Sequence, residues 1–221
     1  MKRCDGRTLA HSLGLGMRDF SVNAGFFLGF LASFAFAGET AVSLLAVGMP
    51  ADCAEFGSVV SRSEGNFRSI SPIVNGIRCY GAFQFCDSGT LQAYWQGTAA
   101  EYLANPAAQV SAWLRYAHDE WGKAIKFGMT NMIGQQVCYQ GTCAVITQSS
   151  ILMACQFGCS KGGKLYNLMK SGLNCNSTDT KDGAGTSVCT FLISGSGYNV
   201  SCVTQSNDGI DCLPVTTAKN E

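Results

Sequence analysis

Most of the chain alternates hydrophobic and polar positions with the period of an α-helix. In residues 51–63, Cys53, Phe56 and Val60 fall on one face at spacings of three and four, which predicts a short helix. Residues 64–66, Glu-Gly-Asn, form a stop signal directly after it. We therefore expect the first helix to bury one face and to end at a carboxyl side chain.

A longer helical pattern occupies the middle of the chain. It starts at Asn105-Pro106, with Asn105 as N-cap and Pro106 at the first helical position, and Gly128 ends it. The positions expected to be buried are Val110, Trp113, Leu114, Ala117, Trp121 and Ile125.

Shorter helical patterns flank this one, each bounded by a capping residue or a glycine. They are predicted over 88–95 with Ser88 as cap, 99–103 after Thr98, 148–157 between Thr147 and Gly158, and 161–172.

The strand signals are fewer and shorter. Residues 66–86 contain Pro72, the turn dipeptide Asn75-Gly76 and a β-rich end, which predicts a hairpin. We also expect short strands within 191–203 and read 173–190 as loop. The pattern as a whole predicts an α+β, mainly α-helical domain.

An apolar run near the N-terminus indicates the cellular compartment. Residues 24–37 carry no charge, follow four basic residues and end in the A-x-A cleavage sequence of residues 35–37. Because the run has only about fourteen residues, it is short for a membrane span. We expect a signal peptide over 1–37, with an uncleaved anchor as the alternative. The rest divides into a mature N-terminal segment (38–50), a main domain (51–203) and a polar tail (204–221).

The charge balance excludes some classes of protein. The chain has 15 Lys+Arg and 15 Asp+Glu, 14% charged and 47% hydrophobic residues. It is too apolar for a disordered chain and not basic enough for a dedicated nucleic-acid binder. Removal of 1–37 takes away four bases and two acids, which leaves a net charge of −2. The sequence predicts no nucleic-acid partner, no metal, no cofactor and no stable membrane span after signal cleavage.

Twelve cysteines with two histidines indicate disulfides in an oxidising compartment rather than zinc sites. We therefore expect a periplasmic or secreted protein. The mature chain would hold eleven cysteines, an odd number. Cys155 and Cys159 can pair with each other or with other segments, and Cys53 bridges elsewhere or stays free. Local spacing favours Cys79–Cys86, Cys138–Cys143, Cys175–Cys189 and Cys202–Cys212.

One acid has a position suited to chemistry. Glu64 ends the first predicted helix, just before the hairpin whose last part is residues 81–85, GAFQF. A carboxyl half-buried against aromatic side chains has a raised pKa and can donate a proton near neutrality. Cleavage of a glycosidic bond needs such an acid for the leaving oxygen. The alternative is a solvated glutamate at a helix end.

The same residues resemble a known family. Residues 63–67 (SEGNF) and 80–85 (YGAFQF) are similar to the E-S/G-G-N-F/Y and G-A/L-Y/F-Q-F signature of the lysozyme-like superfamily, in particular of bacterial lytic transglycosylases and related secreted or phage-tail muramidases. Further blocks, at 103–109 with Trp121, at 133–158 and at 163–187, follow in the order of one branch of that family. The four ordered blocks cover roughly residues 55–198.

The resemblance implies a lysozyme-like fold with a small hairpin beside the catalytic helix. It implies that Glu64 is the catalytic acid and base and that Gln84 shapes the sugar site. Tyr80 and Phe83 would form apolar groove walls, and Gln156 would stand on the far wall. This branch usually carries His at the position of Gln156, and transglycosylases carry Tyr-Asn. Glutamine cannot exchange a proton near pH 7, although it can hydrogen-bond a sugar.

A second carboxylate is usual in lysozyme-type hydrolysis. Asp87, the only acid between Glu64 and Glu101, is the candidate for this carboxylate and is expected to contact the substrate. The alternative is a surface turn residue or the N-cap of 88–95. With one acid the transglycosylase route is more natural. Glu64 then protonates the leaving oxygen and accepts the proton of the muramic 6-hydroxyl, which gives a 1,6-anhydro sugar.

The predicted function is cleavage of peptidoglycan glycan strands by a lytic transglycosylase or muramidase. It would serve local wall remodelling for a secretion, conjugation or phage-like apparatus. The alternative is a catalytically weak glycan-binding or structural module of such an apparatus, which Gln156 and the near-neutral charge favour. A third possibility is an injected antibacterial effector with an immunity protein as partner.

Overall fold

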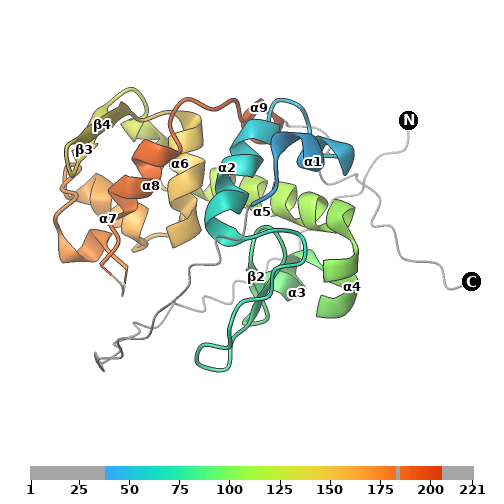
Figure 1. The fold of residues 1–221 in the computed structure, drawn as a ribbon. Helices are drawn as coiled ribbons and strands as arrows, with labels where there is room; N and C mark the ends of the chain where they lie inside the picture. Colours follow the sequence, from blue (N-terminus) through green and yellow to red (C-terminus); the bar gives the residue numbers. More distant parts are fainter. Residues whose placement is uncertain (1–37, 183–184, 206–221) are drawn as a thin grey trace, which may run out of the picture.

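The computed structural model describes residues 38–182 and 185–205, which form a mainly helical α+β structure (Figure 1). The helices are joined by two small antiparallel sheets of two strands each. The predicted signal peptide, Cys212 and nearly all of the predicted tail lie outside the described residues. In the described part of the chain, no helix combines the length and the apolar character needed to cross a membrane.

Helix α5 (Pro106–Lys126) runs through the centre of the molecule (Figure 1). The Oδ1 atom of Asn105 accepts the Ala108 N–H at 3.0 Å, so the predicted cap is confirmed. The prediction that Ile125 is buried is wrong, because this residue is 55% exposed. Ala124, fully buried, continues the stripe at the helical spacing from Trp121. The other five predicted core positions, Val110, Trp113, Leu114, Ala117 and Trp121, are buried.

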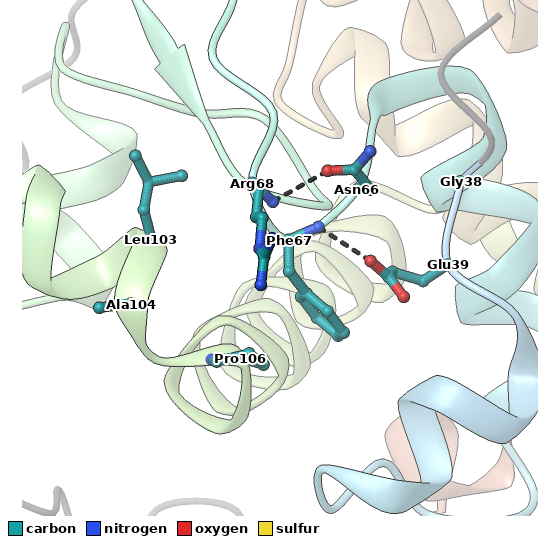
Figure 2. A pocket seen from close by; sticks show the side chains of 8 residues that line it. All are labelled: Gly38, Glu39, Asn66, Phe67, Arg68, Leu103, Ala104 and Pro106. Atoms are coloured by element: carbon teal, nitrogen blue, oxygen red, sulfur yellow. Dashed lines mark hydrogen bonds between the residues drawn. The ribbon is translucent and has the colours of Figure 1, made fainter.

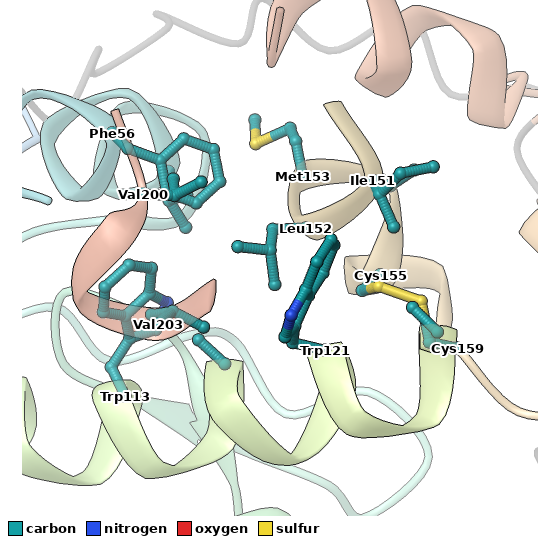
Figure 3. Packing of buried hydrophobic residues seen from close by; sticks show 14 of the residues in the cluster. Phe56, Trp113, Trp121, Ile151, Leu152, Met153, Cys155, Cys159, Val200 and Val203 are labelled. Atoms are coloured by element: carbon teal, nitrogen blue, oxygen red, sulfur yellow. A yellow bond between two sulfur atoms is a disulfide. The ribbon is translucent and has the colours of Figure 1, made fainter. Parts of the chain in front are cut away.

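The N-terminal segment 38–50 packs on the main domain. It contains α1 (Ala41–Ala46), whose Leu44 is buried against α2 (Ala54–Glu64) at Gly57. Helix α2 in turn buries Phe56 and Val60, as the sequence predicts. Figure 3 shows the resulting core, in which side chains of α2, α5, α6 (Gln148–Ala154) and α9 (Ser201–Thr204) meet.

Two short helices lie beside α5, and only one has the predicted cap. Before α4 (Ala99–Ala104), Thr98 and Glu101 form a reciprocal capping box. Before α3 (Thr90–Tyr94), the N-cap position is Gly89, with no side-chain hydrogen bond. The expectation that Ser88 caps this helix is therefore wrong, and Asp87 does not cap it either.

Both small sheets are hairpins closed by a disulfide. Strands β1 (Cys79–Tyr80) and β2 (Phe85–Cys86) pair Cys79 with Cys86. Strands β3 (Gln136–Tyr139) and β4 (Thr142–Val145) pair Cys138 with Cys143. The 3-10 helix η1 (Met129–Met132) connects α5 to the second hairpin.

The C-terminal part is helical where strands were expected. After α6 come η2 (Cys155–Phe157), α7 (Lys164–Lys170), η3 (Thr178–Thr180) and α8 (Val188–Ser194). Helices α8 and α9 occupy most of 191–203, so the strand prediction there is wrong. The buried residues Val188, Cys189 and Leu192 have helical spacing. Two of them precede residue 191, so the range 191–203 alone does not contain the full helical pattern.

Five disulfides cross-link the described residues. Four join residues close in sequence: Cys79–Cys86, Cys138–Cys143, Cys155–Cys159 and Cys175–Cys189. The fifth, Cys53–Cys202, spans 149 residues and corrects the predicted Cys202–Cys212 pair. Disulfides in this number fit a protein of an oxidising compartment.

Candidate active site

Glu64 is the last residue of α2 and lies half-buried where the helix gives way to the first hairpin. Burial raises the pKa of its carboxyl from 4.5 to about 7, because the charged form loses its water. Near neutrality this group is therefore divided between its acid and its base form. A carboxyl in that condition can donate a proton in one step and accept one in the next.

The loop after Glu64 is closed on itself by Ser69. The Asn66 N–H donates to Ser69 Oγ at 2.8 Å, and the Ser69 N–H donates to the Asn66 carbonyl oxygen at 3.0 Å. A Cβ atom at Gly65 would lie 2.7 Å from Ser69 Cβ and Oγ, which leaves no space for any other residue. This tight turn determines how the chain leaves Glu64.

Gln84 lies beside this turn. Its Nε2 donates to the Gly81 carbonyl oxygen at 2.8 Å and comes within 3.3 Å of the space that a Cβ at Gly65 would take. Two residues expected at the site, Glu64 and Gln84, are thus brought to the same loop although they are twenty positions apart in sequence.

Gln109 of α5 joins that loop to the hairpin, and the sequence analysis gave it no role. Its side chain is fully buried, accepts the Ala82 N–H at 2.9 Å and donates to the carbonyl oxygens of Phe67 at 2.9 Å and Tyr102 at 3.1 Å. Gly81 is required here, because its φ is +78° and a Cβ would lie 2.2 Å from Gln109 Oε1. Two signals in the sequence point to it: a polar residue next to Val110 in an apolar stripe, and its place at the end of the block 103–109 that resembles the family.

We expect Gln109→Leu to destabilise the protein by about 2–5 kcal/mol, because it removes the hydrogen-bond partners of the Ala82 N–H and the Phe67 carbonyl oxygen. The Tyr102 carbonyl oxygen loses one bond and keeps the one from the Asn105 N–H at 3.2 Å. Urea denaturation followed by circular dichroism measures the loss. Gln92→Leu, at an exposed position of α3, is the control and should stay within about 0.5 kcal/mol of the wild type. Equal stability of the two variants would contradict the bracing role of Gln109.

A second unpredicted residue, Tyr116 of α5, lies in a ring cluster with Phe85 and Tyr94. Its ring centroid is 5.6 Å from Phe85 and 5.7 Å from Tyr94, both in edge-on geometry. Burial raises the pKa of the Tyr116 hydroxyl, and the negative charges of Glu120, Tyr94 and Glu64 raise it further. Tyr116 and Glu64 are therefore within electrostatic reach of one another.

Gln156 belongs to the turn η2, which Tyr116 also contacts. The Tyr116 hydroxyl donates to the Cys155 carbonyl oxygen at 3.4 Å. The turn is closed by the Cys155–Cys159 disulfide, and the Cys159 N–H donates to Glu120 Oε2 at 2.9 Å. Gln156 is half-buried in this braced turn. Tyr116 thus connects the surroundings of Glu64 with the turn that carries the expected far-wall residue.

Phe83 is in the core rather than on a groove wall. It is 4% exposed and stacks on Trp113, with ring centroids 4.9 Å apart and an angle of 19° between the planes. Its ring is therefore covered by α5 and not open to a sugar, which corrects the role expected for it.

Asp87 and Tyr80 are brought together on the arms of the hairpin. Asp87 Oδ1 accepts the Arg78 N–H at 2.9 Å, and Oδ2 accepts the Tyr80 hydroxyl at 3.4 Å. Asp87 is exposed and Tyr80 half-buried. Both oxygens of Asp87 accept hydrogen bonds within the hairpin. Asp87 therefore acts as a turn residue, which was one of its two alternatives, and not as the N-cap of the following helix.

An open cavity of about 530 Å³ borders the loop that follows Glu64 (Figure 2). In it the Phe67 ring lies between the side chains of Arg68 and Glu39, and the Phe67 N–H donates to Glu39 Oε1 at 2.9 Å. The volume is within the range of small-ligand sites. Glu64 is not part of its wall. The lining residues are Gly38, Glu39, Asn66, Phe67, Arg68, Leu103, Ala104 and Pro106.

In the described chain, a carboxylate comes close to two cysteine sulfurs at two separate places, with the three side-chain atoms of each group within 4.8 Å of one another. The groups are Asp52 with Cys53 and Cys202, and Glu120 with Cys155 and Cys159. In both groups the cysteines form a disulfide, and a disulfide sulfur is not the thiolate that metals bind. Each group thus offers a single carboxylate.

In comparisons with known proteins, no family model, no curated protein and no solved structure matches this chain. The case for a function therefore depends on the chemistry of the Glu64 site and on the motifs around it.

Proposed function

We propose that the protein cleaves peptidoglycan glycan strands as a lytic transglycosylase or muramidase of lysozyme-like fold, with Glu64 as general acid and base. The observation that carries this proposal is the pKa of about 7 at a helix-to-hairpin junction. The nearness of Gln84 to Gly65 in the same loop supports the proposal, as does the resemblance of the SEGNF and YGAFQF motifs. A carboxyl with this pKa has the proton that a leaving glycosidic oxygen needs at neutral pH.

The reaction uses the two states of that carboxyl in turn. Protonated Glu64 donates to the glycosidic oxygen as the bond from the anomeric carbon breaks. The resulting carboxylate then accepts the proton of the muramic 6-hydroxyl while the oxygen of that hydroxyl bonds to the anomeric carbon. This step closes a 1,6-anhydro ring and restores the protonated form of Glu64. In a muramidase, water takes the place of that hydroxyl. Gln84 and Gln156 supply amide groups that can hydrogen-bond sugar hydroxyls.

The five disulfides support a site of action in the periplasm or outside the cell, where glycan strands are found. In that setting we propose local wall remodelling for a secretion, conjugation or phage-like apparatus as the biological role.

A glycan-binding module without turnover is the second candidate. It is favoured by Gln156, which supplies no proton at the far wall, and by Asp87, whose oxygens are both used within the hairpin. Binding to purified sacculi without release of soluble fragments would select this candidate over the enzyme.

Purified sacculi provide the direct test of cleavage. We expect a fall in turbidity and release of soluble muropeptides, and mass spectrometry of the products separates 1,6-anhydro ends from reducing ends. Intact sacculi after prolonged incubation with folded protein would contradict the proposed activity.

The pH dependence follows from the acid role of Glu64. Because the leaving oxygen must receive a proton, we expect the cleavage rate to fall tenfold per pH unit above a midpoint of about 7. Initial rates of muropeptide release between about pH 5 and about pH 9 measure this midpoint. A midpoint near the ordinary glutamate value of 4.5 would contradict proton donation by a buried carboxyl.

A further inference from the structure

The segment between α2 and β1 forms a further hairpin that turns at Asn75-Gly76, and its tip exposes large aliphatic side chains that nothing in the proposed reaction uses. Ile70 is 51%, Ile73 59% and Val74 61% exposed, all within five positions of the sequence. Figure 1 shows this hairpin, between α2 and β2, extending away from the helical body. A cluster of exposed aliphatic residues on a projecting loop indicates a surface that is covered in use.

The backbone of the tip is well suited to an apolar surrounding. Val74 and Ile77 exchange both of their N–H to carbonyl hydrogen bonds at 3.0 Å, which closes the turn over Asn75-Gly76. Further along the hairpin, Ser71 pairs with both backbone groups of Cys79. The Ser71 N–H donates to the Cys79 carbonyl oxygen at 2.9 Å, and the Ser71 Oγ accepts the Cys79 N–H at 2.9 Å. Backbone groups that are paired internally lose little when water is removed around them.

The arms of the hairpin carry positive charge only. Residues 65–86 contain Arg68 and Arg78 and no acid, and three carboxylates, Glu39, Glu64 and Asp87, lie at the base of the hairpin. Arg68 is exposed, and the buried Nε of Arg78 has no hydrogen-bond partner in the structure. Each arm therefore carries one cation, Arg68 at the base of the first arm beside the cavity of Figure 2 and Arg78 next to Ile77 on the second. The Cys79–Cys86 disulfide fixes the end of this hairpin to β2.

We propose that this tip, Ile70 to Ile77, docks on an anionic lipid surface. Ile73 and Val74 enter the boundary of the acyl chains, and Arg68 and Arg78 bind the phosphate groups above it. Aliphatic side chains next to arginines are the combination by which proteins attach to the membrane interface without spanning it. Anionic lipid fits the charge of the arms, and its acyl region fits the aliphatic tip. Attachment of this kind would hold the protein at a membrane face independently of the chemistry at Glu64.

The test uses the full chain and a reporter placed at the tip itself. In Ile73→Trp, the introduced indole should shift its emission to the blue and be quenched by brominated acyl chains when phosphatidylglycerol vesicles are added. Val145→Trp, at a 52% exposed position on β4, is the matched control and should show neither change. Because residues 1–37 contain no tryptophan, binding through that segment does not produce the signal at the tip.

Three further experiments test which part of the lipid and which side chains are responsible for binding. Phosphatidylcholine vesicles should give a much weaker response than phosphatidylglycerol, since each arginine at an anionic surface adds about fivefold to the affinity. Arg68→Gln in the Ile73→Trp background should weaken binding by about that factor. Ile70→Ser with Val74→Ser in the same background should weaken it by about tenfold or more. No response at the tip, or an equal response at the Val145 position, would overturn the proposal and leave a protein partner as the alternative occupant.

Discussion

Glu64→Gln is expected to abolish the release of soluble fragments from purified sacculi while the protein stays folded. Glutamine keeps the shape of the side chain but has no proton to give to the leaving oxygen and no carboxylate to take one back. Since this reaction uses one group as both acid and base, we expect a loss of at least about 10³-fold. Chromatography of the released muropeptides measures the rate, and circular dichroism verifies the fold.

The control for this variant is Glu55→Gln, at the opposite end of the same helix. Glu55 is exposed in the first turn of α2, and replacement there costs at most the interaction of one charge with the helix terminus, about 0.3–1 kcal/mol. We expect full cleavage by this variant. Full cleavage by Glu64→Gln would overturn the assignment of the acid, whatever the product.

The same substitution should make the protein more stable at high pH. The pKa of the Glu64 carboxyl is about 7 in the folded chain against the ordinary glutamate value of 4.5, so the folded state holds the proton more strongly. The stability that this carboxyl contributes is complete below pH 4.5 and is lost as the pH rises to about 7. Glutamine has no such loss. Above pH 7, Glu64→Gln should therefore exceed the wild type by on the order of 1–3 kcal/mol, measured by urea denaturation.

A gain in stability combined with a loss of activity separates a catalytic role from a structural one. If Glu64 merely supported the fold through polar contacts, its replacement would lower stability and activity together. We expect the stability difference between the two proteins to disappear at about pH 4, where both side chains are neutral.

Local signals in the sequence predicted local structure well. Thr98, Asn105 and Thr147 accept hydrogen bonds from the backbone of the helices that they precede, because a cap involves only residues two or three positions away. Three disulfides between residues 5 to 14 positions apart were predicted from spacing for the same reason, and Cys155–Cys159 settles a pairing that spacing left open. The helix–loop junction that carries Glu64 belongs to this class.

Features that depend on distant segments were missed or assigned wrongly. Phe83 belongs to a motif read as a groove wall, and its burial is decided by Trp113, thirty positions away. Gln109 contacts Phe67 and Ala82, which only the folded chain brings together. Helix α8 was read partly as strand because β-branched and aromatic residues have no firm preference outside their packing partners.

The Cys53–Cys202 disulfide closes by far the longest loop among the disulfides of the described residues. It joins the start of α2 to α9 across 149 residues, so its loss frees a long loop in the unfolded chain. We expect Cys53→Ala with Cys202→Ala to cost about 5 kcal/mol on the loop-closure account. The melting temperature and the free energy of unfolding in urea, both under non-reducing conditions, measure the loss.

The comparison pair is Cys138→Ala with Cys143→Ala, which removes the disulfide of the second hairpin. That loop spans 5 residues, and the same account gives about 2 kcal/mol. Cys53 is fully buried while Cys138 and Cys143 are exposed, so lost packing adds to the difference in the same direction. Equal destabilisation of the two variants would mean that the long loop is already constrained in the unfolded chain. Because Glu64 ends the helix that Cys53 precedes, the first variant should also lose cleavage activity at temperatures where the second retains it.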